Sequence, residues 1–480
     1  MTEKNLKFKT KKSLYWQFLN QFGNTGLQFV ITTILARLLT PEDYGITALP
    51  VIFLAVAQCI VESGFGAALI RKPDLSEKDL STAFYYSITV GVFLYLGLFF
   101  ASPFIADFYK APILTSILRV TALGLLISPV ASVQRIQLNR NLEFKTLTKI
   151  SLTCRITTGV IALIIAFSGY GIWALVIPQV VSSLLNIVLL YYFVRWLPRE
   201  HWSKESFKYL WGFGSKLLFS YLIGTIYENI YLLIIGKIFS PAQLGIWNRA
   251  QSYANLPSKQ ATNVLQSVTF PVLSKIQDDE EKLAYNYRRI LRVSAFVVFP
   301  VMLLLTAFAE PFIIILITDK WLDCVPFLKI MSVAMMLYPI HAINLNLLQV
   351  KGRSDLFLRL EIIKKIMGIV ILCITIPLGL VPMACGMLVS SFLCLFVNTY
   401  YTGKLIHVGM LRQTLDIAPI LGISCLMYFA AHFCTKIFSN LYVQVSVGGI
   451  VASILYLGIA IALKRDELND LKYMLKRKEQ

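Results

Sequence analysis

Charged residues are scarce in this chain. They make up 15% of its 480 residues, whereas roughly 25% is usual in soluble globular proteins. Hydrophobic residues make up 57% of the chain and fall in long blocks separated by short charged clusters. No polar stretch between these blocks is long enough for a folded domain. The composition therefore excludes an ordinary soluble protein and indicates an integral membrane protein.

The chain also lacks the residue patterns of metal sites and of enzymes. Its eight cysteines form no CxxC pair, and with the four histidines they give no metal-ligand spacing. Nearly all of these cysteines fall inside or beside apolar blocks, where cysteine usually behaves as a small apolar residue. The short loops offer little room for catalytic carboxylates or histidines. We therefore expect no metal, no cofactor, no disulfide framework and no enzymatic activity.

Fourteen apolar blocks are each long enough to cross a membrane as a helix, which takes about 20 residues. They are centred near residues 26, 55, 91, 124, 157, 184, 223, 255, 304, 336, 367, 392, 424 and 452. The eighth block is the weakest, because it holds charged side chains such as Arg249 and Lys259. The first is too long for a removable signal peptide and has no small-residue cleavage site, so it is expected to be a permanent span.

The basic residues are distributed unevenly between the predicted loops. With the N-terminus inside, 34 of the 45 Lys and Arg residues fall on inner segments and six at outer ends. This bias predicts cytoplasmic N- and C-termini. The net charge of +19 is then explained by topology and by contact with anionic lipid headgroups, so nucleic-acid binding is not expected.

Two segments repeat at a spacing of 200 residues. Residues 34–45 read ILARLLTPEDYG, and residues 234–245 read IIGKIFSPAQLG. A second pair, residues 128–141 and 338–351, is offset by 210. The pattern predicts an all-α membrane protein with two parallel six-helix lobes, residues 1–200 and 201–407, around a central cavity. Residues 408–480 would add two helices and a basic cytoplasmic tail.

Polar side chains recur at helical spacing within the apolar blocks. The predicted cavity amides are Gln21, Asn24 and Gln28 in the first block, Asn255 in the eighth and Asn344 in the tenth. For a single amide, a hydrogen bond between helices worth about 1 kcal/mol is explanation enough. As a set, the stripes favour the walls of a hydrated cavity.

Cations inside the blocks outnumber acids. The candidate substrate-binding residues are Arg119, Arg155, Lys216, Arg249 and Lys259. A charge in mid-bilayer costs at least roughly 2.5–3.5 kcal/mol, so these cations predict water or an anionic ligand beside them. The alternatives are snorkelling to the interface, above all for Arg119, and pairing with a glutamate. Glu228 is the candidate for coupling to a proton or cation, with a salt bridge as its alternative.

Three segments resemble the polysaccharide flippases of the multidrug/oligosaccharidyl-lipid/polysaccharide exporter superfamily: residues 38–45, 62–70 and 137–145. The resemblance implies a bacterial inner-membrane protein that moves undecaprenyl-diphosphate-linked oligosaccharides across the membrane by alternating access. It would serve surface polysaccharide or lipopolysaccharide biosynthesis beside glycosyltransferases and a polymerase. Arg and Lys side chains are suited to the diphosphate.

Three other functions remain open from the sequence. A lipid II flippase has a similar build. A cation-coupled multidrug exporter of the same superfamily would favour an acidic or apolar pocket, because its substrates are often organic cations. A membrane glycosyltransferase or ligase fits less well, because such enzymes generally need catalytic residues on a sizeable loop or domain.

Overall fold

The chain folds into two compact helical units, residues 1–245 and 246–480. The computed structural model describes residues 3–468 and 470, and describes residues 3–14, 267 and 268 by their backbone alone. No strand occurs in this part of the chain. The all-α membrane fold predicted from the sequence is therefore confirmed, whereas the predicted lobe boundaries at residues 200 and 407 stay predictions. Of the predicted basic tail, Lys464 to Lys478, residue 469 and residues 471–478 lie outside the described residues.

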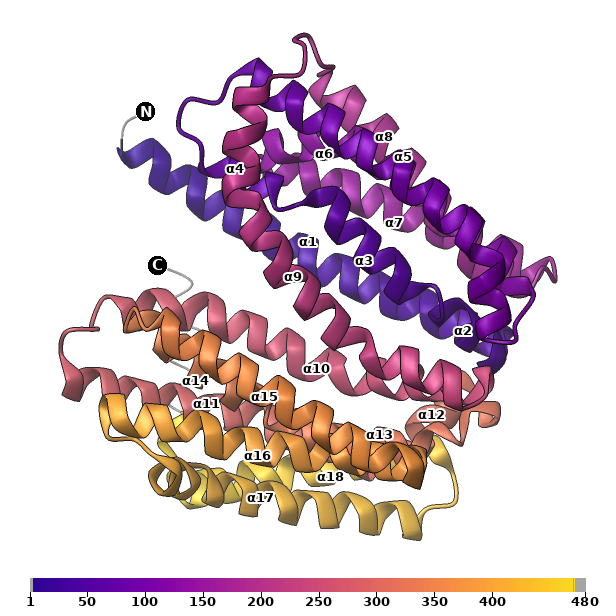
Figure 1. Ribbon diagram of the computed structural model, residues 1–480. Helices are drawn as coiled ribbons and strands as arrows, with labels where there is room; N and C mark the ends of the chain where they lie inside the picture. Colours follow the sequence, from indigo (N-terminus) through magenta and orange to yellow (C-terminus); the bar gives the residue numbers. More distant parts are fainter. Residues whose placement is uncertain (1–2, 469, 471–480) are drawn as a thin grey trace. The chain divides into compact units, whose positions relative to one another are not determined.

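The first unit consists of helices that run back and forth between two ends (Figure 1). Their bounds are α1 Glu3–Leu38, α2 Pro41–Ala48, α3 Val51–Glu62, α4 Phe65–Arg71, α5 Glu77–Phe108, α6 Ile113–Arg140, α7 Phe144–Phe167, α8 Trp173–Val194 and α9 Lys204–Ile238. We call the end where α4, α6 and α8 finish and α5, α7 and α9 begin the basic end. The other, where α1 meets α2, is the proline end.

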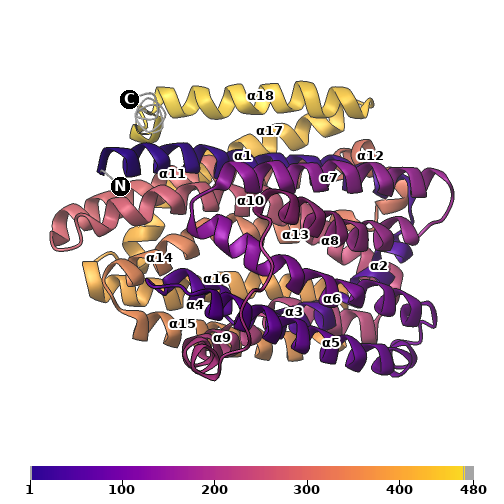
Figure 2. The ribbon, with the colours of Figure 1, turned by 90° about the horizontal axis from the view of Figure 1, so that it is seen from above.

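Within this unit α5 packs along α6, and α8 packs against α6 and α7. Helix α1 lies along α7, as Figure 2 also shows. Helix α9 packs against α3, α4 and α5. Close approach of α9 depends on Gly214, because a Cβ there would lie 2.5 Å from the carbonyl oxygen of Ser63. Helix α9, which the predicted lobe boundary at residue 200 assigns to the second lobe, therefore packs within the first unit.

The second unit is built around α11. Its helices are α10 Pro241–Ser274, whose first five residues still belong to the first unit, α11 Glu280–Ala307, α12 Ala309–Ile317, α13 Cys324–Met336, α14 Tyr338–Val350, α15 Ser354–Thr375, α16 Leu380–Ile406, α17 Met410–Ile437 and α18 Leu441–Ala462. Helix α11 packs against α13, α14 and α17, and α17 packs against α18. Of the apolar stretch of α11, 72% is buried, against 11% in α5, so α11 forms the core of its unit.

Eleven helical segments within the described residues are long and apolar enough to cross a membrane. The remaining three predicted spans form the helices α1, α10 and α15, with 36, 34 and 22 residues. These three carry more polar and charged side chains, such as Lys259 in α10 and Glu361 in α15. The protein is a multi-pass membrane protein, and the count of fourteen spans stays a prediction.

The repeated segments have the same local structure. Thr40 and Asp43 form a capping box at the start of α2, where the Asp43 amide donates to Thr40 Oγ1 at 3.2 Å and the Thr40 amide donates to Asp43 Oδ2 at 2.9 Å. Ser240 and Gln243 repeat both bonds at the start of α10, at 3.2 and 3.1 Å. Each box satisfies amides that a helix start leaves unpaired.

The two repeats also cross each other at backbone contact. A Cβ on Gly45 would lie 1.7 Å from the carbonyl oxygen of Pro241, and one on Gly245 would lie 1.9 Å from that of Pro41. Both segments belong to the first unit. Because the obstacle is backbone in each case, no side-chain movement relieves it, and only glycine fits at either position.

We expect Gly45→Ala and Gly245→Ala each to destabilise the protein by about 3 kcal/mol, the upper part of the usual range for overpacking. In thermal unfolding of the detergent-solubilised protein this corresponds to a fall in apparent Tm of roughly 3–6 °C, because the unfolding entropy grows with chain length. Gly26→Ala is the matched control, because nothing lies within 4 Å of a Cβ at that position. Equal Tm values for the three variants would contradict the crossing.

Candidate functional site

The first unit encloses a cavity of about 1320 Å³. Its walls come from α3, α4, α5, α6, α7, α8 and α9, and the described lining residues lie between positions 55 and 229. Its polar and charged lining residues are Gln58, Glu62, Ser87, Ser128, Ser132, Arg135, Asn139, Arg155, Thr158, Gln179, Ser182, Ser183, Asn186, Ser220, Thr225, Glu228 and Asn229. We call this space the first-unit cavity.

Helical periodicity places the polar side chains on the cavity wall. In α8 the lining residues Gln179, Ser182, Ser183 and Asn186 follow steps of three and four. In α9 the lining residues recur every four positions, from residue 220 to residue 229. Residues at these spacings share one face of a helix, so α8 and α9 each turn a polar face to the cavity.

Two arginines enter this cavity without a carboxylate partner. Arg155 lies midway along α7 and is half-buried, and Arg135 lies near the basic end of α6. No Asp or Glu oxygen lies within 4.0 Å of either guanidinium, as far as the chain is described. In the second unit, by contrast, Arg288 of α11 donates two hydrogen bonds of 2.7 Å to the buried carboxylate of Asp416 on α17. An unpaired guanidinium within a membrane-spanning unit requires water or an anion beside it.

The cavity also holds two acids. Glu62 accepts a hydrogen bond of 2.9 Å from Gln58 Nε2, and Gln58 Oε1 accepts one of 3.1 Å from Ser128. Glu228 is exposed on α9 and lines the cavity. The cavity is therefore polar with both signs of charge, rather than uniformly cationic. Among the residues that the structure describes, no three His, Cys, Asp or Glu side chains gather as a metal site would require.

A break between α3 and α4 borders the cavity. Ser63 and Gly64 both have positive φ, +44° and +68°, and Gly64 lines the cavity. For Ser63, left-handed backbone costs roughly 1–2 kcal/mol. Its hydroxyl is fixed by Tyr86 Oη at 2.8 Å and by the carbonyl oxygen of Ile60. Strain of this kind collects at functional sites, where the surroundings hold it in place.

The structure brings two of the sequence-predicted site residues together, Arg155 and Glu228, in the wall of the first-unit cavity. Lys216 lies on α9 one turn before the lining residue Ser220, and its side chain is exposed outside the lining. Arg119 donates to Ser102 Oγ at 3.0 Å and lies over the ring of Phe99 at 4.1 Å. Arg119 therefore joins α6 to α5 and contributes to helix packing.

The predicted amides of α1 lie outside this cavity. Asn24 Nδ2 donates to Ser151 Oγ of α7 at 2.9 Å and to Asn20 of its own helix. Gln21 is half-buried and Gln28 is exposed. For Asn24, the contacts match the helix-to-helix hydrogen bonding that the sequence left as the alternative.

The remaining predicted residues belong to the second unit. Arg249 is buried beside the rings of Tyr253 and Trp321, at 5.7 and 5.8 Å. Lys259 is exposed and Asn255 is half-buried on the same helix. Asn344 is buried in a network with Gln413 and Thr402. That these residues bind substrate stays a prediction.

Sequence reasoning missed two features of this wall. Arg135 lies only five residues before the end of α6, so its place in the sequence indicates an inner loop rather than a cavity wall. The polar face of α8 is the other feature, and its spacing from Gln179 to Asn186 is the helical pattern i, i+3, i+4, i+7.

The fold is shared with solved transporters. A lipid II flippase MurJ in an inward closed conformation matches with a TM-score of 0.74 and 16% identity, over 95% of this chain and 100% of that one. An inward-facing multidrug resistance MATE family transporter of the MOP superfamily matches with a TM-score of 0.61 and 15% identity, over 83% and 95%. At such identities the likeness shows the fold alone.

The sequence decides the family. The model of the family described as "Polysaccharide biosynthesis protein" matches residues 34–326. The chain belongs to this family. Teichuronic acid biosynthesis protein TuaB of Bacillus subtilis is 29% identical over 343 residues, covering 71% of both chains. Lipopolysaccharide biosynthesis protein WzxC of Escherichia coli is 24% identical over 427 residues, covering 88% of this chain and 84% of its own. The flippase resemblance noted in the sequence is thereby confirmed.

A water-filled cavity in this family member should make Cys59 reactive. Cys59 lines the cavity and is half-buried, whereas Cys154 is buried in a hydrophobic cluster and is not among the described lining residues. With the other seven cysteines replaced by Ser, we expect a small water-soluble methanethiosulfonate to label Cys59 at least about tenfold faster than Cys154 in the matching single-cysteine variant. Mass spectrometry measures the two rates. Similar rates would mean that the cavity is closed to water.

Proposed function

We propose that the protein is a flippase that moves undecaprenyl-diphosphate-linked oligosaccharides across the bacterial inner membrane by alternating access. It acts as a transporter and not as an enzyme, and it supplies surface polysaccharide or lipopolysaccharide biosynthesis. The observation that carries the proposal is the first-unit cavity with its unpaired Arg135 and Arg155. Family membership supports the polysaccharide part of the cargo.

The chemistry of the cavity suits such a cargo. Guanidinium groups bind phosphate oxygens with two parallel hydrogen bonds, and the serine and amide side chains of α8 and α9 offer partners for sugar hydroxyl groups. A prenyl chain stays favourably in lipid. The cargo therefore needs a polar path for its head group alone, which a cavity inside a membrane-spanning unit supplies.

Two neighbouring functions fit less well. A multidrug exporter for organic cations would not favour two unpaired arginines in its cavity, although Glu62 and Glu228 would suit it. A lipid II flippase also carries a diphosphate-linked sugar lipid, so the cavity charges do not separate it from the proposed function. The family match favours polysaccharide precursors, since it is to polysaccharide biosynthesis proteins.

The proposed topology has both termini in the cytoplasm. The basic end of the first unit, with Arg71, Lys72, Arg140 and Lys145, then faces the cytoplasm, in agreement with the positive-inside bias. Anionic lipid headgroups would meet these residues. Glycosyltransferases and a polymerase are the expected functional neighbours, because they make and consume the cargo.

Arg155→Ala should impair transport without preventing membrane insertion. Hydrogen bonds to charged groups contribute about 1.5–3 kcal/mol, so we expect a roughly 10- to 100-fold lower translocation rate of lipid-linked glycan in proteoliposomes. Lys216→Ala and Lys259→Ala, the other predicted cations, test whether binding extends beyond the first-unit cavity. A flippase-deficient strain complemented with each variant should show matching losses of surface polysaccharide.

Arg353→Ala is the matched control, because this exposed residue is paired with Asp355 at 2.8 Å and lies outside the cavity. Its activity should equal that of the wild type. Normal transport in the Arg155→Ala variant at wild-type expression would overturn the assignment. The lipid-linked intermediate that accumulates when the gene is deleted identifies the cargo, and a peptidoglycan precursor in its place would favour the lipid II alternative.

Glu228 is the proposed coupling residue. The variant Glu228→Gln keeps the shape of the side chain but cannot lose a proton. We expect it to slow turnover more than substrate binding and to flatten the dependence of transport on pH. Rates measured in proteoliposomes across a pH series check this. An unchanged pH profile would remove Glu228 from the mechanism.

A further inference from the structure

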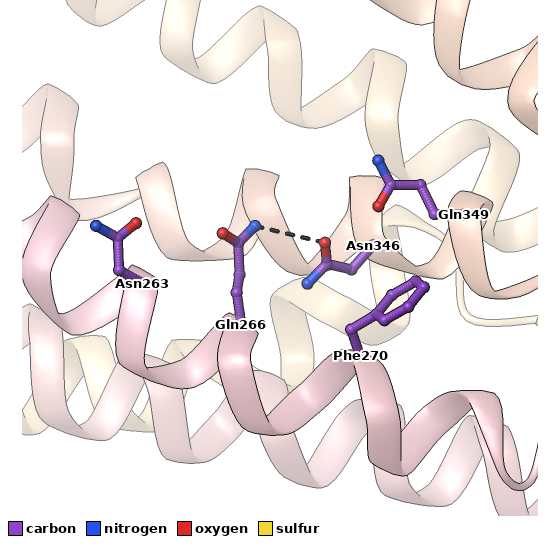
Figure 3. Close-up of a pocket in the computed structure, with 5 residues that line it drawn as sticks. All are labelled: Asn263, Gln266, Phe270, Asn346 and Gln349. Carbon is purple, nitrogen blue, oxygen red and sulfur yellow. Dashed lines mark hydrogen bonds between the residues drawn. The ribbon is translucent and has the colours of Figure 1, made fainter. Parts of the chain in front are cut away.

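A second, smaller pocket in the second unit is lined almost entirely by carboxamides. It has a volume of about 370 Å³. Asn263, Gln266 and Phe270 line it from α10, and Asn346 and Gln349 from α14 (Figure 3). None of these described lining residues is charged. We call this space the carboxamide pocket.

Asn346 is the buried member of the set. Its side chain is 7% exposed, and its Oδ1 accepts a hydrogen bond of 3.4 Å from Gln266 Nε2. Its Nδ2 has no hydrogen-bond partner among the residues that the structure describes. A buried N–H group without a partner costs roughly 1–3 kcal/mol. Such a group beside an open pocket points to a ligand that supplies the acceptor.

Comparison with Asn344 shows that this donor is not needed for packing. The two asparagines are two positions apart on α14, so their side chains point to roughly opposite faces of the helix. Asn344 Nδ2 donates to Ile340 O at 2.9 Å and to Gln413 Oε1 at 3.1 Å, and its Oδ1 also accepts bonds. On the packing face of α14 the side-chain amide of Asn344 is fully hydrogen-bonded. On the pocket face the Nδ2 group of Asn346 has no acceptor among the described residues.

The chemistry of the pocket matches an uncharged sugar. Each carboxamide offers both donors and acceptors, which is what neighbouring hydroxyl or acetamido groups require. The ring of Phe270 is 41% exposed and offers an apolar surface to the C–H face of a sugar ring. The absence of Lys and Arg from the lining disfavours a phosphate group. The volume lies near the lower end of the roughly 300–1,000 Å³ typical of ligand sites.

The position of the pocket suits the loading of cargo. Phe270 lies four residues before the end of α10, and Gln349 lies one residue before the end of α14. Both helix ends lie on the side that the proposed topology assigns to the cytoplasm, where lipid-linked glycans are assembled. The side chains of the pocket would meet a glycan before it crosses the membrane.

We propose that the carboxamide pocket binds an uncharged sugar residue of the transported glycan and thereby contributes to substrate selection. The proposal rests on the proposed function for the identity of the ligand. It goes beyond that function in separating the recognition of sugar, by neutral amides in the second unit, from the recognition of phosphate by the arginines of the first-unit cavity.

Direct binding measurements test the separation. The purified full chain in lipid nanodiscs is titrated with three probes: the lipid-linked oligosaccharide extracted from the gene-deleted strain, the free oligosaccharide released from it by mild acid, and undecaprenyl diphosphate. We expect Asn346→Leu to weaken binding of both glycan probes about tenfold, because it removes the buried donor, and to leave the affinity for undecaprenyl diphosphate within about twofold of the wild type.

Two further variants keep the test independent of folding. Gln349→Leu changes an exposed residue of the rim and should also weaken glycan binding. Asn286→Leu is the matched control, because among the described residues its amide bonds to Lys282 O of its own helix, and it should bind all probes as the wild type does.

The outcomes separate the two proposals. Unchanged glycan affinity in Asn346→Leu and Gln349→Leu, or equal losses for all three probes, would overturn the carboxamide pocket. Failure of undecaprenyl diphosphate to bind, or binding that Arg155→Ala does not weaken, would instead count against the proposed function. Binding of the free glycan that depends on Asn346 would still support the pocket in that case.

Discussion

A guanidinium group cannot remain dry and unpaired inside a membrane-spanning unit, and the first unit is organised around this constraint. The cost of exposing a charge to hydrocarbon is several kcal/mol, and no carboxylate offsets it at Arg155 within the described residues. The surrounding helices supply the alternative, a space open enough for water or an anion. Hydroxyl and amide groups on one face of α8 and α9 line that space with hydrogen-bond partners. The arginines and the cavity therefore depend on each other.

Polar groups within the helices serve two different purposes in this protein. Asn24, Asn344 and Asp416 have partners on neighbouring helices and fix how those helices pack. Arg155 and the Nδ2 group of Asn346 face open space instead. Both kinds look alike in sequence, as an isolated polar residue in an apolar block. Only the identity of the neighbour separates a structural group from one that can bind a ligand.

The sequence was sufficient for the all-helical fold and the membrane character, because hydropathy and helical periodicity are read along the chain. It also placed Arg155 and Glu228 among the cavity candidates, since charges in an apolar block are costly wherever they point. It was not sufficient for Arg135, whose nearness to a helix end suggested a loop, or for α9, whose packing on α3 to α5 depends on Gly214 meeting the carbonyl of Ser63. Contacts between distant segments are set by shape, which periodicity does not contain.

The crossing of the two repeats has a consequence for how this sequence can vary. Gly45 and Gly245 each abut the carbonyl of the other repeat's proline, so a shift of either backbone changes the room available at both positions. Substitutions at the two sites should be thermodynamically coupled rather than additive, as expected for residues that share one contact. The two copies of the motif therefore constrain each other. A substitution at the glycine of one copy changes which residues fit at the glycine of the other.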